Sequence, residues 1–179
     1  MSELFSIQLQ NRQQQGRDGV WLDLPTTTEQ VQAALRQIGI SSDNPQGLFI
    51  SGYFAEEEKR FAIPYNMVLA SNVDELNFLA SRLETLSAGE RAELNAALQA
   101  PQSELSSIGR ITDFPENVDY YVHLPDVHGP AQLGDYYLNR SGMVDMPEEW
   151  KGGIDTAQFG RHVAQQEQGV FTEYGYLVK

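Results

Sequence analysis

The spacing of apolar residues changes along this chain of 179 residues, and those changes restrict the fold more than any other feature. Phe5, Ile7 and Leu9 alternate with polar residues, which is the period of a strand with one buried face. Strand patterns return over 20–24 and 47–54, and a helical period separates these two segments. The first 64 residues therefore predict a small α+β unit.

Three segments have the Ser/Thr/Asn-x-x-Glu spacing of a helix N-terminus, at 26–29, 72–75 and 87–90. The helix after the first of them has one apolar face and ends at Gly39, which suits a left-handed C-terminal residue. Shorter helices are predicted over 65–70 and 103–112. These patterns predict a central helical bundle over 65–112.

The remaining residues, 113–179, contain both strand-like and helix-like spacings of apolar residues. A strand pattern over 118–124 precedes a helix that starts at Pro130 and closes at Gly142. Asp155 is placed to cap a further helix, and the last residues fit a hairpin that turns near Gly175. This third part is predicted to be an α+β unit with short helices. The predicted domains are 1–64, 65–112 and 113–179.

Acidic residues exceed basic ones by 25 to 12, for a net charge of −13. The excess grows along the chain, from −2 over 1–50 to −4 over 51–110 and −7 over 111–179. A hydrophobic content of 41% is typical of a folded protein, so the charge belongs to a folded surface. Such a surface repels nucleic acid and attracts basic grooves, although acidity also serves solubility alone.

The chain has no cysteine, so disulfides, thiolate metal sites and cysteine nucleophiles are all excluded. Its N-terminal residues lack a basic segment followed by an apolar one, and no window reaches the ~20 apolar residues of a membrane helix. We therefore expect a cytoplasmic protein with no membrane association.

Few residues suggest catalysis or metal binding. His123, Asp126 and His128 are possible metal ligands, but their spacing matches no established ligand pattern. Carboxylate pairs are expected by chance among 25 acids, and the sequence has no nucleophile elbow, phosphate-binding loop or His-Glu-x-x-His motif. We expect neither an enzyme nor a bound cofactor or metal.

The last third resembles the ArdA-type antirestriction proteins, which mobile elements carry to block restriction enzymes. The residues that carry the resemblance are Tyr136-Tyr137, Gly142, Pro147, Ile154-Asp155, Phe159-Gly160-Arg161 and the Gly-x-Phe-x-x-x-Gly-Tyr-Leu pattern from Gly169 to Leu177. Upstream, Gly19 to Pro25 and Tyr53 are similar to the family's N-terminal domain. One departure is Arg161-His162-Val163, where an Arg-Asp-Leu continuation is expected, so this chain lacks an acid there.

The resemblance implies an elongated three-part chain that forms a symmetric homodimer through its third domain and acts without catalysis or cofactor. It also implies a DNA mimic that occupies the DNA-binding groove of a type I restriction-modification enzyme. The alternatives are an acidic adaptor for another basic protein and, third, a small hydrolase.

Carboxylates are the expected phosphate mimics, and no Lys or Arg occurs between Arg110 and Arg140 to neutralise them locally. The predicted recognition residues are Asp113, Glu116, Asp119, Asp126, Asp135, Asp145, Glu148 and Glu149, extended by Glu56, Glu57 and Glu58. The candidates for the dimer interface are aromatic or apolar. They are Tyr136, Tyr137, Met143 and Trp150.

Overall fold

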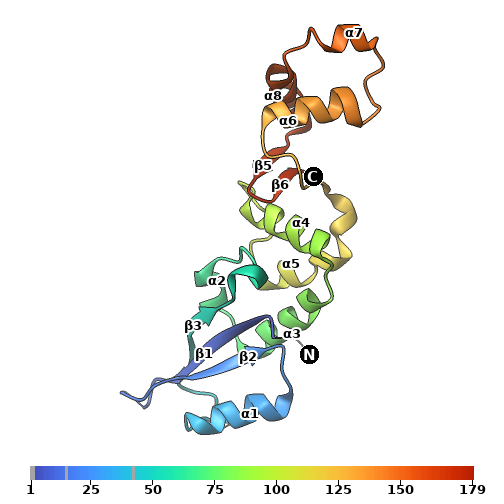
Figure 1. Cartoon of the computed structure of the whole chain (residues 1–179). Coiled ribbons are helices and arrows are strands. Elements are labelled where there is room, and N and C mark those ends of the chain that lie inside the picture. Colours follow the sequence, from blue (N-terminus) through green and yellow to red (C-terminus); the bar gives the residue numbers. More distant parts are fainter. Residues whose placement is uncertain (1–2, 15, 42) are drawn as a thin grey trace. The chain divides into compact units, whose positions relative to one another are not determined.

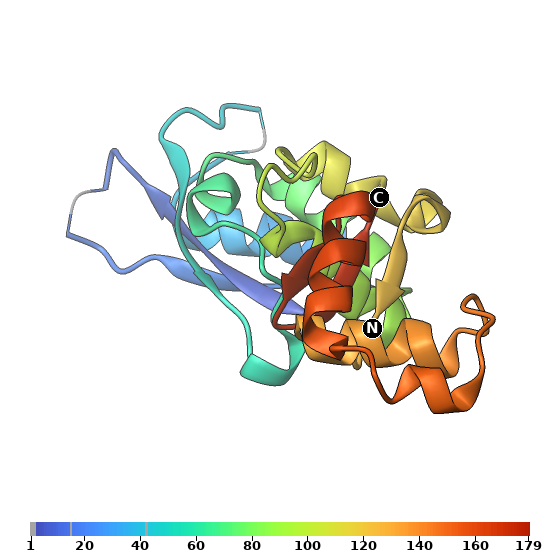
Figure 2. The same cartoon turned by 90° about the horizontal axis from the view of Figure 1, so that it is seen from above.

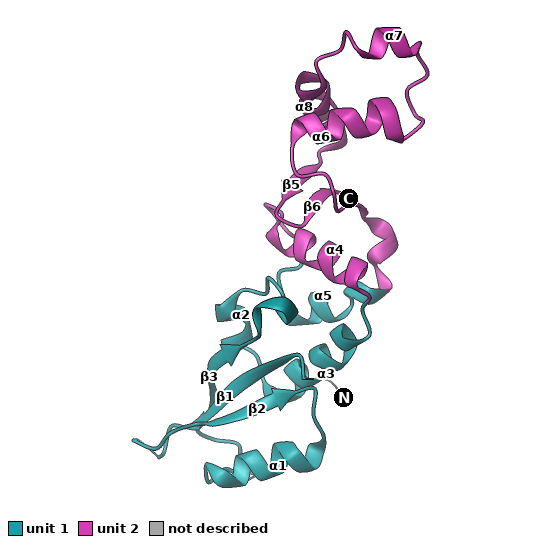
Figure 3. Ribbon diagram, viewed as in Figure 1, with its two compact units in different colours: residues 1–86, 105–115 teal, residues 87–104, 116–179 magenta. Residues whose placement is uncertain are grey.

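A computed structural model describes residues 3–14, 16–41 and 43–179. It confirms the α+β class, with two three-stranded sheets and several short helices (Figure 1). Contacts divide the chain into two compact units (Figure 3). Unit 1 is 1–86 with 105–115, and unit 2 is 87–104 with 116–179. The three-domain division stays a prediction.

The sheet of unit 1 has the order β2-β1-β3, and both pairings are antiparallel. Its strands are β1 (Phe5–Asn11), β2 (Val20–Leu24) and β3 (Leu48–Phe54). Alternate residues such as Ile7, Leu9 and Leu24 are fully buried, as the two-residue period predicts. The register of β1 against β3 shifts between Gln8 and Leu9.

Helices bury their apolar stripes against one face of that sheet, because the helix and the sheet each have only one apolar side. They are α1 (Thr28–Gln37), α2 (Tyr65–Leu69) and α3 (Val73–Glu84). Helix α5 (Ile108–Thr112) packs against α3, and a 3-10 turn, η1 (Glu57–Lys59), follows β3. On α3 the stripe is Leu76, Leu79 and Leu83, all with no exposed area.

Two predicted helix starts in unit 1 are wrong. The cap of α1 is Thr27, whose side chain accepts a hydrogen bond from Gln30 N, and not Thr26. The helix predicted over 103–112 begins only at Ile108, because the Ser107 side chain caps it by accepting from Arg110 N.

Unit 2 contains the second sheet, with the antiparallel order β4-β6-β5. Its strands are β4 (Val122–Leu124), β5 (Val170–Thr172) and β6 (Gly175–Val178), and α4 (Ala88–Gln99) packs against β6. The strand predicted over 118–124 is therefore too long, since 118–120 form the 3-10 helix η3 (Val118–Tyr120). A further 3-10 turn, η2 (Phe114–Glu116), precedes it.

The other helices of unit 2 follow β4. They are α6 (Pro130–Asp135), a π-helix η4 (Tyr136–Arg140), α7 (Glu148–Lys151) and α8 (Thr156–Glu167). Pro130 begins α6, Gly142 directly follows the C-terminal cap of η4, and Asp155 caps α8, all as predicted. The π-helix was not predicted.

Helices α6 and α8 lie side by side (Figures 1 and 2) and approach most closely at two glycines. A Cβ on Gly160 would lie 1.8 Å from Pro130 O, and one on Gly134 would lie 1.9 Å from Thr156 O. Neither distance is possible for real atoms, so this crossing requires glycine on both helices.

A hydrophobic cluster in the core of unit 2 includes residues of both helices. It consists of Val127, Leu133, Ala164 and Tyr176. None of the helices within the described ranges is both long and apolar enough to cross a membrane.

Candidate partner-binding surface

The eleven acids predicted for recognition are all exposed. In unit 1, Glu56 to Glu58 form the charged turn after β3, and Asp113 is the C-terminal cap of α5. The other seven belong to unit 2, on turns, short helices or an irregular segment. They are Glu116, Asp119, Asp126, Asp135, Asp145, Glu148 and Glu149. Exposure leaves these carboxylates accessible to a cationic partner, and their role in recognition stays a prediction.

The negative charge is denser on unit 2. Its sequence contains thirteen acids against five bases, a net charge of −8. The corresponding figures for unit 1 are twelve and seven, a net of −5. Unit 2 thus has the stronger field for attracting a basic partner.

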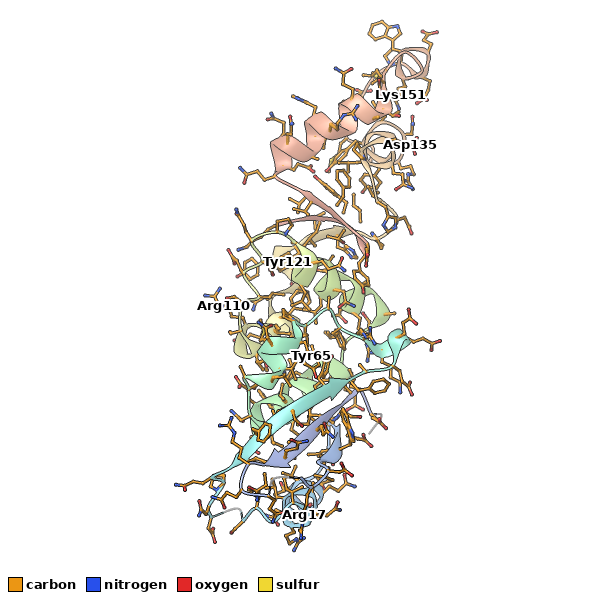
Figure 4. All side chains as sticks on the ribbon, turned by 90° about the vertical axis from the view of Figure 1, so that its left-hand side faces the viewer. Arg17, Tyr65, Arg110, Tyr121, Asp135 and Lys151 are labelled. Atoms are coloured by element: carbon orange, nitrogen blue, oxygen red, sulfur yellow. The ribbon has the colours of Figure 1, made fainter. Side chains whose placement is uncertain are left out.

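Glu56, Asp135 and Glu148 each have a cation nearby. Lys59 lies 3.1 Å from Glu56, Arg140 lies 3.6 Å from Asp135, and Lys151 donates to Glu148 at 2.8 Å. Asp135 and Lys151 are both labelled in Figure 4. Exposed pairs of this kind contribute only ~0–1 kcal/mol, so a partner's cations compete with them easily.

Sequence reasoning missed an acidic group in unit 2 that is not fully exposed. Glu93 on α4 is half-buried, and among the residues that the structure describes its Oε1 has no hydrogen-bond partner. Burial, with help from the negative charges of Glu90 and Asp119, raises the pKa of Glu93 to about 7. The spacing of Glu90 and Glu93 predicts a shared helix face, but nothing in the sequence places Asp119 beside them.

Glu90 has a structural role instead. Its carboxylate accepts from Ser87 N at 2.8 Å, while the Ser87 hydroxyl accepts from Glu90 N, which completes the predicted capping box. The hydrogen bonds from the Ser87 side chain and backbone lower the pKa of Glu90.

The four dimer-interface candidates differ in exposure. Met143 is 76% exposed and Trp150 is 66% exposed, whereas Tyr136 and Tyr137 are half-buried against the core of unit 2. The guanidinium of Arg140 lies 5.5 Å from the centre of the Tyr136 ring. Met143 and Trp150 therefore offer more apolar area to a second chain than the two tyrosines do.

Tyr137 and Tyr176 share one acceptor. Both hydroxyls donate to the carboxylate of Glu167, the second of them at 2.8 Å. Burial, followed by these hydrogen bonds, raises the pKa of both phenols well above the usual range. The arrangement fixes the end of α8 to β6.

His123 and His128 each contact a backbone carbonyl. His123 Nε2 lies 2.7 Å from Tyr174 O, and His128 Nδ1 lies 3.4 Å from Thr172 O. Across the described ranges, no three His, Cys, Asp or Glu side chains gather as a metal site. The two histidines connect β4 and the following turn to the last hairpin.

Comparison with protein families decides the family. The model of the antirestriction protein ArdA matches residues 15–178. This chain belongs to the ArdA family. No curated protein matches it. Membership supports an antirestriction protein whose partners are restriction-modification systems. The family match spans both units, so the exposed acids of both lie within the ArdA region.

Proposed function

We propose that this ArdA-family protein inhibits type I restriction-modification enzymes as a DNA mimic. In this function its carboxylates take the place of phosphates in the DNA-binding groove, and neither catalysis nor a cofactor is involved. The observation that carries the proposal is the exposure of all eleven predicted acids on a chain of net charge −13. A groove that binds duplex DNA neutralises about one phosphate charge per ~1.7 Å of axis with Lys and Arg. Carboxylates satisfy the same cations.

We further propose a homodimer joined through unit 2, with Met143 and Trp150 at the interface. Their exposure supports this, because large apolar side chains in water favour a covered state. Two chains carry twice 13, or 26, net negative charges. That equals the charge of about 44 Å of duplex, a useful length of groove. The place of action is the cytoplasm, where restriction enzymes meet incoming DNA.

The decisive experiment is competition for the enzyme. Purified protein is added to a type I restriction-modification enzyme bound to a labelled duplex, and the released duplex is measured. We expect stoichiometric displacement. If an excess of protein leaves the duplex bound, the proposal is wrong, and the search for a different basic partner becomes the next step.

Salt distinguishes charge-based binding from apolar docking. Contacts between carboxylates and Lys or Arg are screened over ~8 Å at physiological ionic strength, so affinity for the enzyme should fall steeply as salt rises. An affinity that stays constant from low to high salt would contradict the proposal. Because each exposed pair contributes only ~0–1 kcal/mol, neutralising Asp119 alone should change inhibition little, while neutralising six acids together should abolish it.

A further inference from the structure

The sheet of unit 1 has one face that its helices do not use. This outer face is formed by two cross-strand rows of residues on β2, β1 and β3. One row is Asp23, Ser6 and Phe54, and the next is Trp21, Gln8 and Gly52. Trp21 is 50% exposed and Phe54 is 57% exposed, whereas Leu22 and Leu24, on the other face of β2, are buried.

The Trp21 side chain reaches across this face. A Cβ on Gly52 would lie 3.0 Å from Trp21 Cη2, so the indole extends from β2 across β1 and covers Gly52 on β3. Beneath it, Ser51 Oγ donates to Gln8 Oε1 at 3.1 Å and holds that side chain in place. The indole therefore contacts the sheet at its outer ring, while half of the Trp21 surface remains exposed.

Carboxylates flank the ring. Asp23 is two residues from Trp21 on β2 and so about 7 Å away on the same face. Its Oδ1 accepts from Ser6 Oγ at 2.7 Å, and the same hydroxyl lies 3.5 Å from Glu3 Oε1. Within β1, β2 and β3, all of whose residues are described, there is no Lys or Arg. At the end of the face where Ser6 lies, the charged groups are thus the carboxylates of Asp23 and Glu3, while Arg12 follows the opposite end of β1.

An aromatic face beside fixed carboxylates suits a guanidinium group. Arginine stacks on indole and pairs with a carboxylate at the same time, while the ammonium of lysine is more strongly hydrated and does not stack. The same face already contains such a pair. Phe49, opposite Gln10 on β1, has the guanidinium of Arg12 5.0 Å from its ring centre.

We propose that the outer face is a docking surface for an arginine side chain of the basic partner, with Trp21 as the stacking platform and Asp23 as the ion-pair acceptor. The inference rests on the proposed function for the identity of that partner. It adds to the phosphate-mimicking acids a contact that depends on ring shape as well as on charge. Negative charge around the ring disfavours the other common ligand of an aromatic platform, a nucleobase with its phosphate.

The first test uses fluorescence and needs no enzyme. Trp21 and Trp150 are the two tryptophans of the chain, so Trp150→Phe leaves Trp21 as the sole indole emitter. We expect a nona-arginine peptide to change Trp21 emission at concentrations several-fold lower than nona-lysine. Equal responses to the two peptides would mean unspecific charge attraction and overturn the proposal. A larger response to a single-stranded oligonucleotide would also overturn it.

The second test uses the competition assay with the full-length protein. A cation–π contact at an exposed site corresponds to about two-fold to five-fold in affinity. The Trp21→Leu variant should therefore require about two-fold to five-fold more protein than wild type to displace the duplex. Trp21→Phe should recover most of the affinity. Phe78→Leu is the matched control, because Phe78 on α3 is 60% exposed but lies away from the outer face.

The outcomes separate this inference from the proposed function. If wild type fails to displace the duplex, the mimic itself is wrong. If wild type succeeds and Trp21→Leu matches it, or if Phe78→Leu is weakened equally, only the platform is wrong. Thermal unfolding of each variant identifies a loss that comes from misfolding, and the fluorescence test, which keeps Trp21 intact, then decides.

Discussion

Replacing Glu93 by glutamine should stabilise unit 2, and the gain should grow as pH rises from about 4.5 to about 7. The folded protein raises the pKa of this carboxyl from 4.5 to about 7, through burial and the charges of Glu90 and Asp119. A raised pKa means that the fold prefers the protonated form. Between about pH 4.5 and pH 7 the folded chain thus binds more protons than the unfolded chain, so its stability falls as pH rises through that window.

The size of the effect follows from the shift. A change from 4.5 to about 7 corresponds to about 3 kcal/mol if the group were fully removed from water. Glu93 is only half-buried, so solvent screening reduces this to about 1–2 kcal/mol. Glutamine has nearly the same shape and no charge. We expect Glu93→Gln to be more stable than wild type by that amount at pH 8, and by less at pH 5.5.

The measurement is thermal or urea unfolding of both proteins at several pH values. A gain of 1–2 kcal/mol corresponds to a rise in Tm of about 2–8 °C for a chain of this size. Glu149→Gln is the control, because it removes the same charge from an exposed position. If Glu93→Gln gives a stability difference that does not depend on pH, or one that Glu149→Gln reproduces, then the carboxyl of Glu93 is not strained in the fold.

Three further predictions concern unit 2. Gly160→Ala should cost about 2 kcal/mol or more in unfolding free energy, because the new Cβ meets the backbone of α6 at 1.8 Å, and the ~1 kcal/mol gain in helix propensity does not compensate. Glu167→Gln should cost about 1–3 kcal/mol, because the amide has one oxygen in place of two and accepts from only one of the Tyr137 and Tyr176 hydroxyls. Both costs are measured by urea unfolding. Trp150→Ala should shift the protein toward monomer in sedimentation, because an aromatic anchor at an interface contributes ~2 kcal/mol or more.

Each of the three has a matched control in the same unit. A Cβ on Gly152 meets nothing within 4 Å, so Gly152→Ala should leave stability nearly unchanged. Glu173→Gln alters an exposed carboxylate that accepts from Gln99, and it should cost less than Glu167→Gln. Tyr120 is 71% exposed, and Tyr120→Ala should not change the sedimentation of the proposed dimer. A wild-type monomer at micromolar concentration would contradict the third prediction outright.

The sequence predicted those parts of the fold that depend on neighbours along the chain. Asn72, Ser87 and Asp155 each accept from the backbone N–H three residues later, as their spacing indicated. Gly39 is left-handed with φ +72°. Both partners of a capping bond lie within four residues, so a short segment contains all the information required.

Prediction failed where a distant group decides the local structure. Thr26 has the capping spacing, but its backbone N–H donates to Asn77 Oδ1 at 2.8 Å, and its carbonyl accepts from Asn77 Nδ2 at 3.0 Å. Those two bonds join α3 to the end of β2 and move the cap to Thr27. Asn77 is 51 residues away in the sequence, and no local pattern indicates the pairing.

In the candidate site, too, some features follow from the sequence alone and others depend on contacts between distant residues. The exposure of acids in turns and at helix ends follows from their charge, and all eleven are exposed. The partial burial of Glu93 depends on elements brought together by the fold, and so does the shared acceptor of Tyr137 and Tyr176. The sequence therefore predicts which charges are accessible but not which of them the fold perturbs.

The residues that identify the family and those proposed to bind its target make different physical contributions. Gly160 allows α8 to approach α6, and a Cβ on Gly169 would lie 2.0 Å from the hydroxyl of Tyr176. Gly175 has φ +116°, which few other residues adopt. These landmarks are packing and backbone requirements, each satisfied by one residue type. A carboxylate on an exposed turn has no such requirement, because its field extends over a Debye length and a neighbouring acid supplies a similar one. Substituting a landmark should thus remove inhibition by unfolding unit 2. Exchanging an exposed acid for one at a neighbouring surface position should preserve inhibition as long as the net charge is unchanged.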